Sequence, residues 1–123
     1  MTEEQKRKTQ WLNRAYYADR KIESLKKLRE VNEKYRDETT ESQIKRDTER
    51  INIELTRIMK YKDEIENAIA EVKDDELEAI LNMRYLCYMN VSEIADTMFY
   101  DRKTIQRKHL KALDRISCPI MSQ

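Results

Sequence analysis

Apolar residues recur every three or four positions along the first third of the chain. Between residues 9 and 36 they include Trp11, Leu12, Ala15, Ala18, Ile22, Leu25, Leu28, Val31 and Tyr35. This spacing places one apolar stripe along an α-helix. A polar run at 37–42 follows, without an aliphatic side chain and with hydroxyl and carboxylate groups that can cap a helix. We therefore predict an amphipathic helix over 9–36 and a turn at 37–42.

The apolar repeat is stricter between residues 43 and 73. Steps of four and three alternate through Ile44, Thr48, Ile51, Leu55, Ile58, Lys62, Ile65, Ile69 and Val72. An aliphatic repeat of this length is typical of a coiled-coil seam, in which polar interruptions such as Thr48 and Lys62 can fix the register. The pattern predicts a second long helix over 43–73.

The two predicted helices have nearly equal length. At about 1.5 Å per residue each spans roughly 40 Å, and a short polar joint between them favours an antiparallel helical hairpin. The alternative is that the second helix pairs with its copy in another chain, as a homodimer through the arm. The two arrangements can coexist, because a two-helix hairpin leaves apolar surface that a dimer would bury.

The heptad pattern stops where three acids stand together at 74–76. Acidic residues suit the first turn of a helix, where the helix dipole is positive. We place a domain boundary here, between a coiled-coil arm at 1–73 and a C-terminal domain at 74–123.

The C-terminal segment has the pattern of three short helices. The first covers 75–88, and a connection at 89–91 leads to a second helix that Ser92 can cap. After a turn at 99–100, Asp101 caps a third helix over 102–117. The small Ala95 would let the second and third helices cross closely, as a helix-turn-helix requires. The predicted fold class is therefore all-α, with a long N-terminal helical hairpin and a C-terminal three-helix helix-turn-helix domain.

Composition narrows the classes of function. The chain has 123 residues, of which 40% are charged, no glycine, and one proline, Pro119. Without glycine there can be no Walker loop or dinucleotide-binding turn, and the single His109 leaves no recognisable triad, so we do not expect an enzyme. We expect His109 to be a surface or partly buried residue. Cys87 and Cys118 form no CxxC pair, and we expect no metal or other cofactor.

No secretory leader or membrane span is expected from the sequence either. The N-terminal residues lack an apolar core, and no stretch approaches the ~20 apolar residues of a membrane helix. We therefore expect a cytoplasmic protein without a membrane partner.

Charge is balanced overall but biased in the third C-terminal helix. The formal net charge is +1, so any nucleic-acid binding must depend on where the charge lies. Between residues 101 and 115 there are two acids against six basic residues, Arg102, Lys103, Arg107, Lys108, Lys111 and Arg115. A basic helix in this position fits the major groove of double-stranded DNA and the phosphates that line it.

Four segments of the C-terminal third resemble a known family. They are Arg84-Tyr85, residues 91–96 (VSEIAD), residues 101–107 (DRKTIQR) and residues 111–116 (KALDRI). Together they look like region 4 of sigma-70-type factors. With the N-terminal arm, the chain is similar to the RinA/ArpU-type late-gene activators of phages that infect Gram-positive bacteria. The resemblance implies a phage or bacterial transcription regulator, with RNA polymerase as a candidate partner.

The chain departs from the region-4 pattern at two positions. Phe99 stands where the family usually has a glycine, and a left-handed backbone there would be unfavourable by roughly 1 kcal/mol. Lys108 stands where the family usually has an aliphatic residue.

The candidate DNA contacts follow from these positions. Early residues of a recognition helix reach base edges, so the candidates for base reading are Arg102, Lys103, Thr104, Gln106 and Arg107. Lys108 and Lys111 are candidate phosphate contacts, and Ser92 is a candidate contact to the opposite backbone. The main rival hypothesis is a coiled-coil interaction protein, such as a phage assembly factor or an anti-sigma-like or RNA polymerase-binding protein, that makes no DNA contact.

Overall fold

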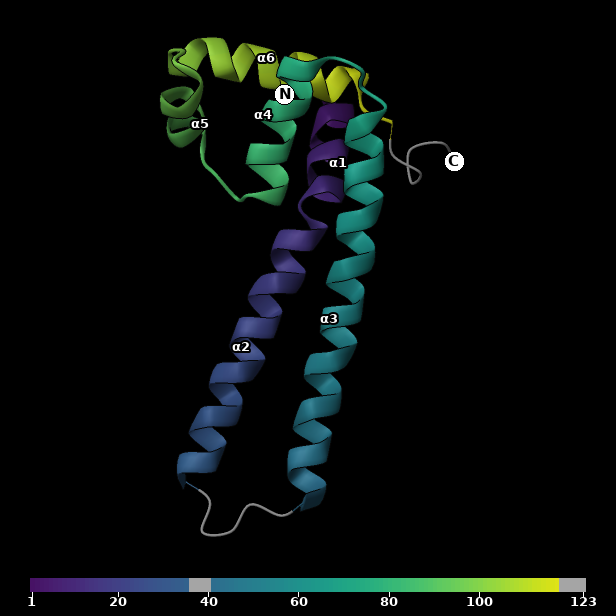
Figure 1. Cartoon of the computed structure of the whole chain (residues 1–123), viewed down its shortest axis with the longest axis vertical. Coiled ribbons are helices and arrows are strands. Elements are labelled where there is room, and N and C mark those ends of the chain that lie inside the picture. Colours follow the sequence, from purple (N-terminus) through teal and green to yellow (C-terminus); the bar gives the residue numbers. More distant parts are fainter. Residues whose placement is uncertain (36–40, 118–123) are drawn as a thin grey trace.

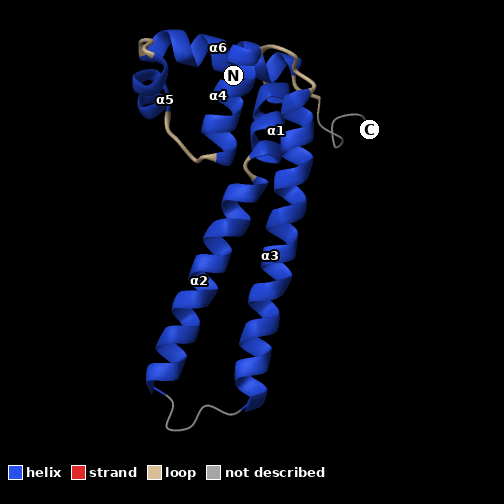
Figure 2. Cartoon of the chain, viewed as in Figure 1, coloured by secondary structure: helices blue, strands red, loops and turns tan. Residues whose placement is uncertain are grey.

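The structure is a computed structural model that describes residues 1–35 and 41–117. Every regular element in these residues is a helix, so the predicted all-α class is confirmed (Figure 2). In chain order the elements are α1 (Glu3–Leu12), α2 (Arg14–Tyr35), α3 (Glu41–Ala70), α4 (Asp75–Leu81), a π-helical turn (Asn82–Leu86), α5 (Val91–Met98) and α6 (Arg102–Arg115).

The two longest helices, α2 and α3, lie side by side and run in opposite directions (Figure 1). They form an arm that extends away from the shorter helices, which gather at one end. Most of the predicted turn at 37–42 lies outside the described residues. No helix within residues 1–35 and 41–117 is both long enough and apolar enough to cross a membrane.

The N-terminal helix starts earlier than the apolar pattern predicted, and it is divided. It begins at Glu3, not near residue 9, because Thr2 and Gln5 form a capping box in which each side chain binds the other's backbone N–H. The helix then breaks at Asn13, where the carbonyl of Trp11 accepts hydrogen bonds from the Asn13 N–H and from Arg14 Nε. The segment predicted as one helix is therefore two.

The first helix of the C-terminal segment is shorter than predicted. The helix predicted over 75–88 is α-helical only to Leu81 and then widens into a single π-helical turn. The left-handed backbone of Tyr88, with φ of 59°, follows the end of this turn. Asp74 caps α4 by accepting a hydrogen bond from the Leu77 N–H, in line with the acidic start predicted at 74–76.

The prediction that Ser92 caps the next helix is wrong. Asn90 is the cap, because its side chain accepts from the Glu93 N–H while the Glu93 carboxylate accepts from the Asn90 N–H. Ser92 is the second residue of α5. The prediction that Asp101 caps α6 is confirmed, since its carboxylate accepts a hydrogen bond from the Thr104 N–H.

One hydrophobic cluster joins the arm to the C-terminal helices. It includes Trp11 and Leu12 of α1, Ile65 and Ile69 of α3, and Leu113 of α6. A second, smaller cluster of Ile80, Ile94, Ala95 and Ile105 lies between α4, α5 and α6. Both ends of the chain thus contribute to the same packed unit at the base of the arm.

The far half of the arm is packed less completely than the repeat predicted. Apolar residues expected on the buried stripes of α2 and α3 are between 40% and 52% exposed, namely Leu28, Val31, Ile44 and Leu55. Two antiparallel helices can cover only the side on which they face each other, so apolar positions flanking that side stay in solvent.

Candidate nucleic-acid interface

The geometry of α6 is set by its buried face. Ile105, Ala112 and Leu113 are completely buried, and Ile105 packs with Ile94 and Ala95 of α5. A small residue at position 95 allows α5 and α6 to approach closely, as the sequence predicted. Because this side is buried, the opposite side of α6 faces outward.

The carboxyl-terminal end of α6 is held by α1. Lys8 Nζ donates a hydrogen bond of 2.9 Å to the Leu113 carbonyl, and Gln5 Nε2 donates one of 3.0 Å to the Asp114 carboxylate. Lys8 is only 6% exposed, so its aliphatic stem is part of the packing. The sequence predicts neither contact, because its apolar stripe places the start of the first helix near residue 9 and leaves Gln5 and Lys8 outside it. The Thr2–Gln5 capping-box spacing was the signal that could have shown the helix starting before them.

The amino-terminal two-thirds of α6 presents a basic face to solvent. Five of the predicted site residues lie on it and are exposed, namely Arg102, Lys103, Gln106, Arg107 and Lys111. Within the described part of the chain none of these side chains forms an ion pair or hydrogen bond with another residue. Four exposed cations without an ion-pair partner make a surface that attracts anions, although Arg107 also interacts at longer range with the Asp101 carboxylate.

Thr104 and Ser92 are less accessible than these five. Thr104 is half-buried and belongs to the cap of α6, where hydrogen bonds from its hydroxyl and its backbone N–H hold the pKa of Asp101 below its usual value. Ser92 is half-buried in the first turn of α5. The structure thus places both residues at helix starts and not on the open face of α6.

Lys108 lies apart from the other basic residues of α6. Its ammonium group forms an ion pair with Glu76 at the start of α4, and the Tyr100 hydroxyl donates a 2.6 Å hydrogen bond to the same carboxylate. These two hydrogen bonds lower the pKa of Glu76. Lys108 is half-buried, and its charge is compensated by Glu76. Its observed role is to join α6 and the preceding turn to α4.

His109 is a partly buried residue, as predicted. Its Nε2 lies 2.6 Å from the Tyr85 hydroxyl. Burial lowers the pKa of His109 to about 4, and the nearby positive charge of Arg84 lowers it further in the same direction. Burial also raises the pKa of Tyr85. The hydrogen bond therefore joins two neutral groups at neutral pH, beneath the exposed face of α6.

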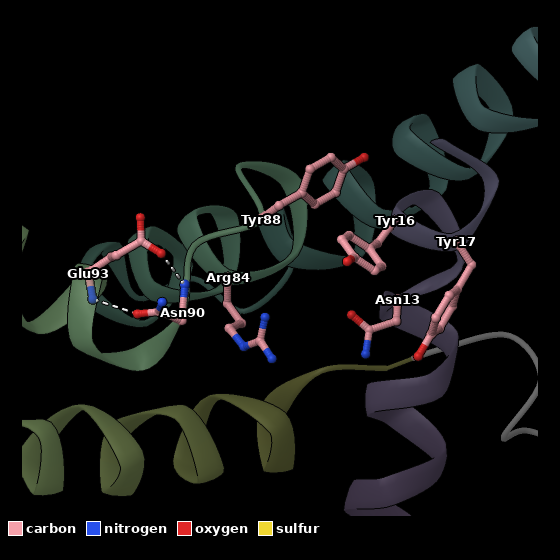
Figure 3. Close-up of a pocket in the computed structure, with 7 residues that line it drawn as sticks. All are labelled: Asn13, Tyr16, Tyr17, Arg84, Tyr88, Asn90 and Glu93. Atoms are coloured by element: carbon pink, nitrogen blue, oxygen red, sulfur yellow. Dashed lines mark hydrogen bonds between the residues drawn. The ribbon is translucent and has the colours of Figure 1, made fainter. Parts of the chain in front are cut away.

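A polar pocket of about 280 Å³ lies where the arm meets the C-terminal helices (Figure 3). Its walls are Asn13, Tyr16, Tyr17, Arg84, Tyr88, Asn90 and Glu93. The only carboxylate among these seven residues, Glu93, already caps α5 together with Asn90. The guanidinium of Arg84 makes one long hydrogen bond, of 3.4 Å, to the Met89 carbonyl.

Comparison of the chain with protein-family models, with curated proteins and with solved structures finds no match. The resemblance to sigma-70 region 4 therefore stays a prediction from the residues that suggest it. The physical properties of the α6 surface are the remaining guide to function.

Proposed function

We propose that the protein binds double-stranded DNA through the exposed face of α6 and acts as a transcription regulator of phage or bacterial type. The observation that carries the proposal is the contrast between the two sides of α6. One side is fully buried, and the other presents four unpaired cations and Gln106 to solvent. An exposed helix of 14 residues with this character matches the element that helix-turn-helix proteins insert into the major groove.

The proposed roles follow from position along α6. Arg102, Lys103, Gln106 and Arg107 lie in its first two turns and would reach base edges, where Arg pairs with guanine and Gln with adenine. Lys111 lies farther along and would contact phosphate. Thr104 and Ser92, at helix starts, would contribute polar contacts to the DNA backbone. We leave Lys108 out of the contact set, because its charge is compensated by Glu76.

A direct test measures binding to duplexes recovered by selection from random sequence, across a range of salt concentrations. Binding through phosphates should weaken steeply as salt rises, because counterions are released on binding. The variant R102A/K103A/R107A should lose affinity by about a hundredfold or more and show a shallower salt dependence.

The matched control is K26A/K27A/K60A, which removes the same charge from exposed lysines of the arm. This control should bind like the wild type. Equal weakening in both triple variants would show only a general charge effect and would contradict the proposed site. Absence of duplex binding by the wild type would favour the rival protein-interaction function.

The proposal assigns the arm a pairing role, with a second copy of the chain as the partner. Its far half exposes large apolar side chains on α2 and α3, among them Leu28, Val31, Ile44 and Leu55. Ile44 and Leu55 are positions of the heptad repeat of α3 that the chain itself leaves partly uncovered, so a second copy could pack against them. A dimer would present two recognition helices, as helix-turn-helix proteins do at two-fold symmetric sites.

Sedimentation equilibrium tests this pairing role. The variant L28E/I44E/L55E should be monomeric at concentrations where the wild type associates. If the wild type is itself monomeric at high concentration, the pairing role is wrong, and RNA polymerase becomes the candidate partner of the arm. Both roles would place the protein with the DNA, in the bacterial cytoplasm.

A further inference from the structure

The turn between α5 and α6 contains a large aromatic residue in an unfavourable backbone conformation. Phe99 ends α5 with φ of 60° and ψ of 39°, in the left-handed region. A Cβ atom is crowded in this conformation, and helices that end in this way usually do so at glycine or asparagine. The phenyl ring is 94% exposed.

The fold makes use of the backbone of this residue but not of its ring. The Phe99 N–H bonds to the Ala95 carbonyl, and the Tyr100 N–H bonds to the same carbonyl, so the turn closes through main-chain groups alone. Any residue that tolerates the left-handed region would make these bonds. Since the ring is almost fully in solvent, it contributes little burial to the fold.

The described residues include two other non-glycine residues with a left-handed backbone, and the side chain of each has an evident environment. Lys73, with φ of 56°, directs a charged side chain into solvent. Tyr88, with φ of 59°, packs its ring edge-on against Tyr16 at 5.3 Å between centroids. Asparagine tolerates the left-handed region better than phenylalanine, so the backbone conformation alone does not explain a phenylalanine at position 99.

The position of the ring relative to α6 suggests what it contacts. Phe99 precedes the cap residue Asp101 by two positions and Arg102 by three, so it stands beside the end of α6 that would enter the groove first. Strained residues persist where the surrounding structure holds them for a purpose, and they cluster at sites of function. An exposed ring that precedes the exposed cations of α6 by a few residues matches a surface that contacts both the apolar and the charged parts of DNA.

We propose that Phe99 is a further DNA-contacting residue, whose ring packs against the C5-methyl group of a thymine next to the bases read by α6. Phenylalanine is one of the side chains that make apolar contact with this methyl group in the major groove. The inference rests on the proposed function, because it requires that α6 dock on duplex DNA.

The test exploits the opposite effects that the backbone and the ring predict. Phe99→Gly relieves the crowded backbone and removes an exposed ring, so its Tm should equal or exceed that of the wild type. If the ring contacts DNA, the same variant should bind the selected duplex about tenfold more weakly. Phe99→Asn, which also suits the left-handed region, should behave in the same way, whereas Phe99→Leu should retain most of the affinity.

A second measurement assigns the contact to a methyl group. Replacing each thymine of the selected duplex in turn by deoxyuridine removes only the C5-methyl. At one position the replacement should weaken wild-type binding and have little further effect on Phe99→Gly, because the two changes remove the same contact. Independent, additive losses at every position would overturn the assignment to a thymine methyl.

The outcomes separate this inference from the proposed function. If Phe99→Gly binds DNA like the wild type while R102A/K103A/R107A does not, the DNA contact of Phe99 is wrong and the function of α6 stands. If Phe99→Gly binds DNA normally but loses transcriptional activity, the ring contacts a protein and the inference is overturned. If the wild type binds no duplex DNA, both fail together.

Discussion

The base and the tip of the arm are built from the same two helices but differ in packing. At the base, side chains such as Ala15 of α2 and Ile65 of α3 are completely buried. Toward the tip, Val31 of α2 and Ile44 of α3 are about half exposed. The amphipathic repeat is continuous through both regions, so the repeat alone does not cause the difference.

The difference arises from what covers each region. At the base, α1, α4 and α6 close over the hairpin and complete one hydrophobic cluster (Figure 1). At the tip, α2 and α3 have only each other among the described residues. An apolar stripe therefore predicts that a helix packs against a partner. It does not predict how much of the stripe is covered within one chain.

The largest expected effect comes from shortening the same residue type in the two regions of α3. Ile65→Ala should lower the free energy of unfolding by about 3 kcal/mol, because it leaves a cavity in a fully buried site. Ile44→Ala, at a repeat position near the tip that is 48% exposed, should lower it by less than about 1 kcal/mol. Urea unfolding at low protein concentration measures both, and equal losses would contradict the contrast between base and tip.

Between pH 6.5 and 4, a histidine at the packed end should contribute to the pH dependence of stability. The folded pKa of His109 is about 4, below the 6.5 that is ordinary for histidine, so the unfolded chain binds a proton more readily between these values. The contribution is complete above pH 6.5 and is lost as the pH falls toward 4, by roughly 3 kcal/mol at most. His109→Gln should flatten this part of the curve of unfolding free energy against pH. An unchanged slope in that variant would show that carboxylates cause the acid sensitivity.

A smaller effect is expected at the contact between α1 and α6. Lys8→Met keeps the aliphatic stem but removes the hydrogen bond to the Leu113 carbonyl and a 3.5 Å ion pair with the exposed Glu4, and should lower the unfolding free energy by about 1–2 kcal/mol. Lys6→Met removes only an exposed ion pair with Glu3 and should change it by less than about 0.5 kcal/mol. Should the two variants be equally stable in chemical denaturation, α1 does not stabilise α6 in the way the contact indicates.

The smallest effect distinguishes the two candidate caps of α5. Asn90→Ala should lower the unfolding free energy by about 1 kcal/mol, because the Glu93 N–H loses its side-chain acceptor. Ser92→Ala lies inside the first turn and should leave stability nearly unchanged. Thermal unfolding followed by circular dichroism measures both. A larger loss for Ser92→Ala would restore the cap that the sequence first suggested.

Much of the local structure could be predicted from short-range patterns. The heptad positions between Ile44 and Val72 predict the long helix α3, and Asp101 followed by a basic amphipathic run predicts α6 and its cap. These features depend on periodicity and on side chains that bind backbone groups a few residues away. The residues that determine them are therefore close together in the sequence.

The candidate site could be predicted only in part, for the same reason. The sequence identifies the cations of α6, but it does not show that Lys108 is paired with Glu76, 32 residues away, while Arg102 and Lys103 are unpaired. Likewise Lys8 binds the Leu113 carbonyl across 105 residues.

Periodicity and capping in the linear chain were thus enough to establish that the protein is helical, where α3 and α6 run, and which helix carries the excess of positive charge. The three-dimensional packing settled which apolar positions are covered, which cations stay free and which end of α6 is held by α1. These properties come from contacts between residues far apart in sequence, whose energies depend on the relative placement of whole helices and leave no periodic signal in any single segment.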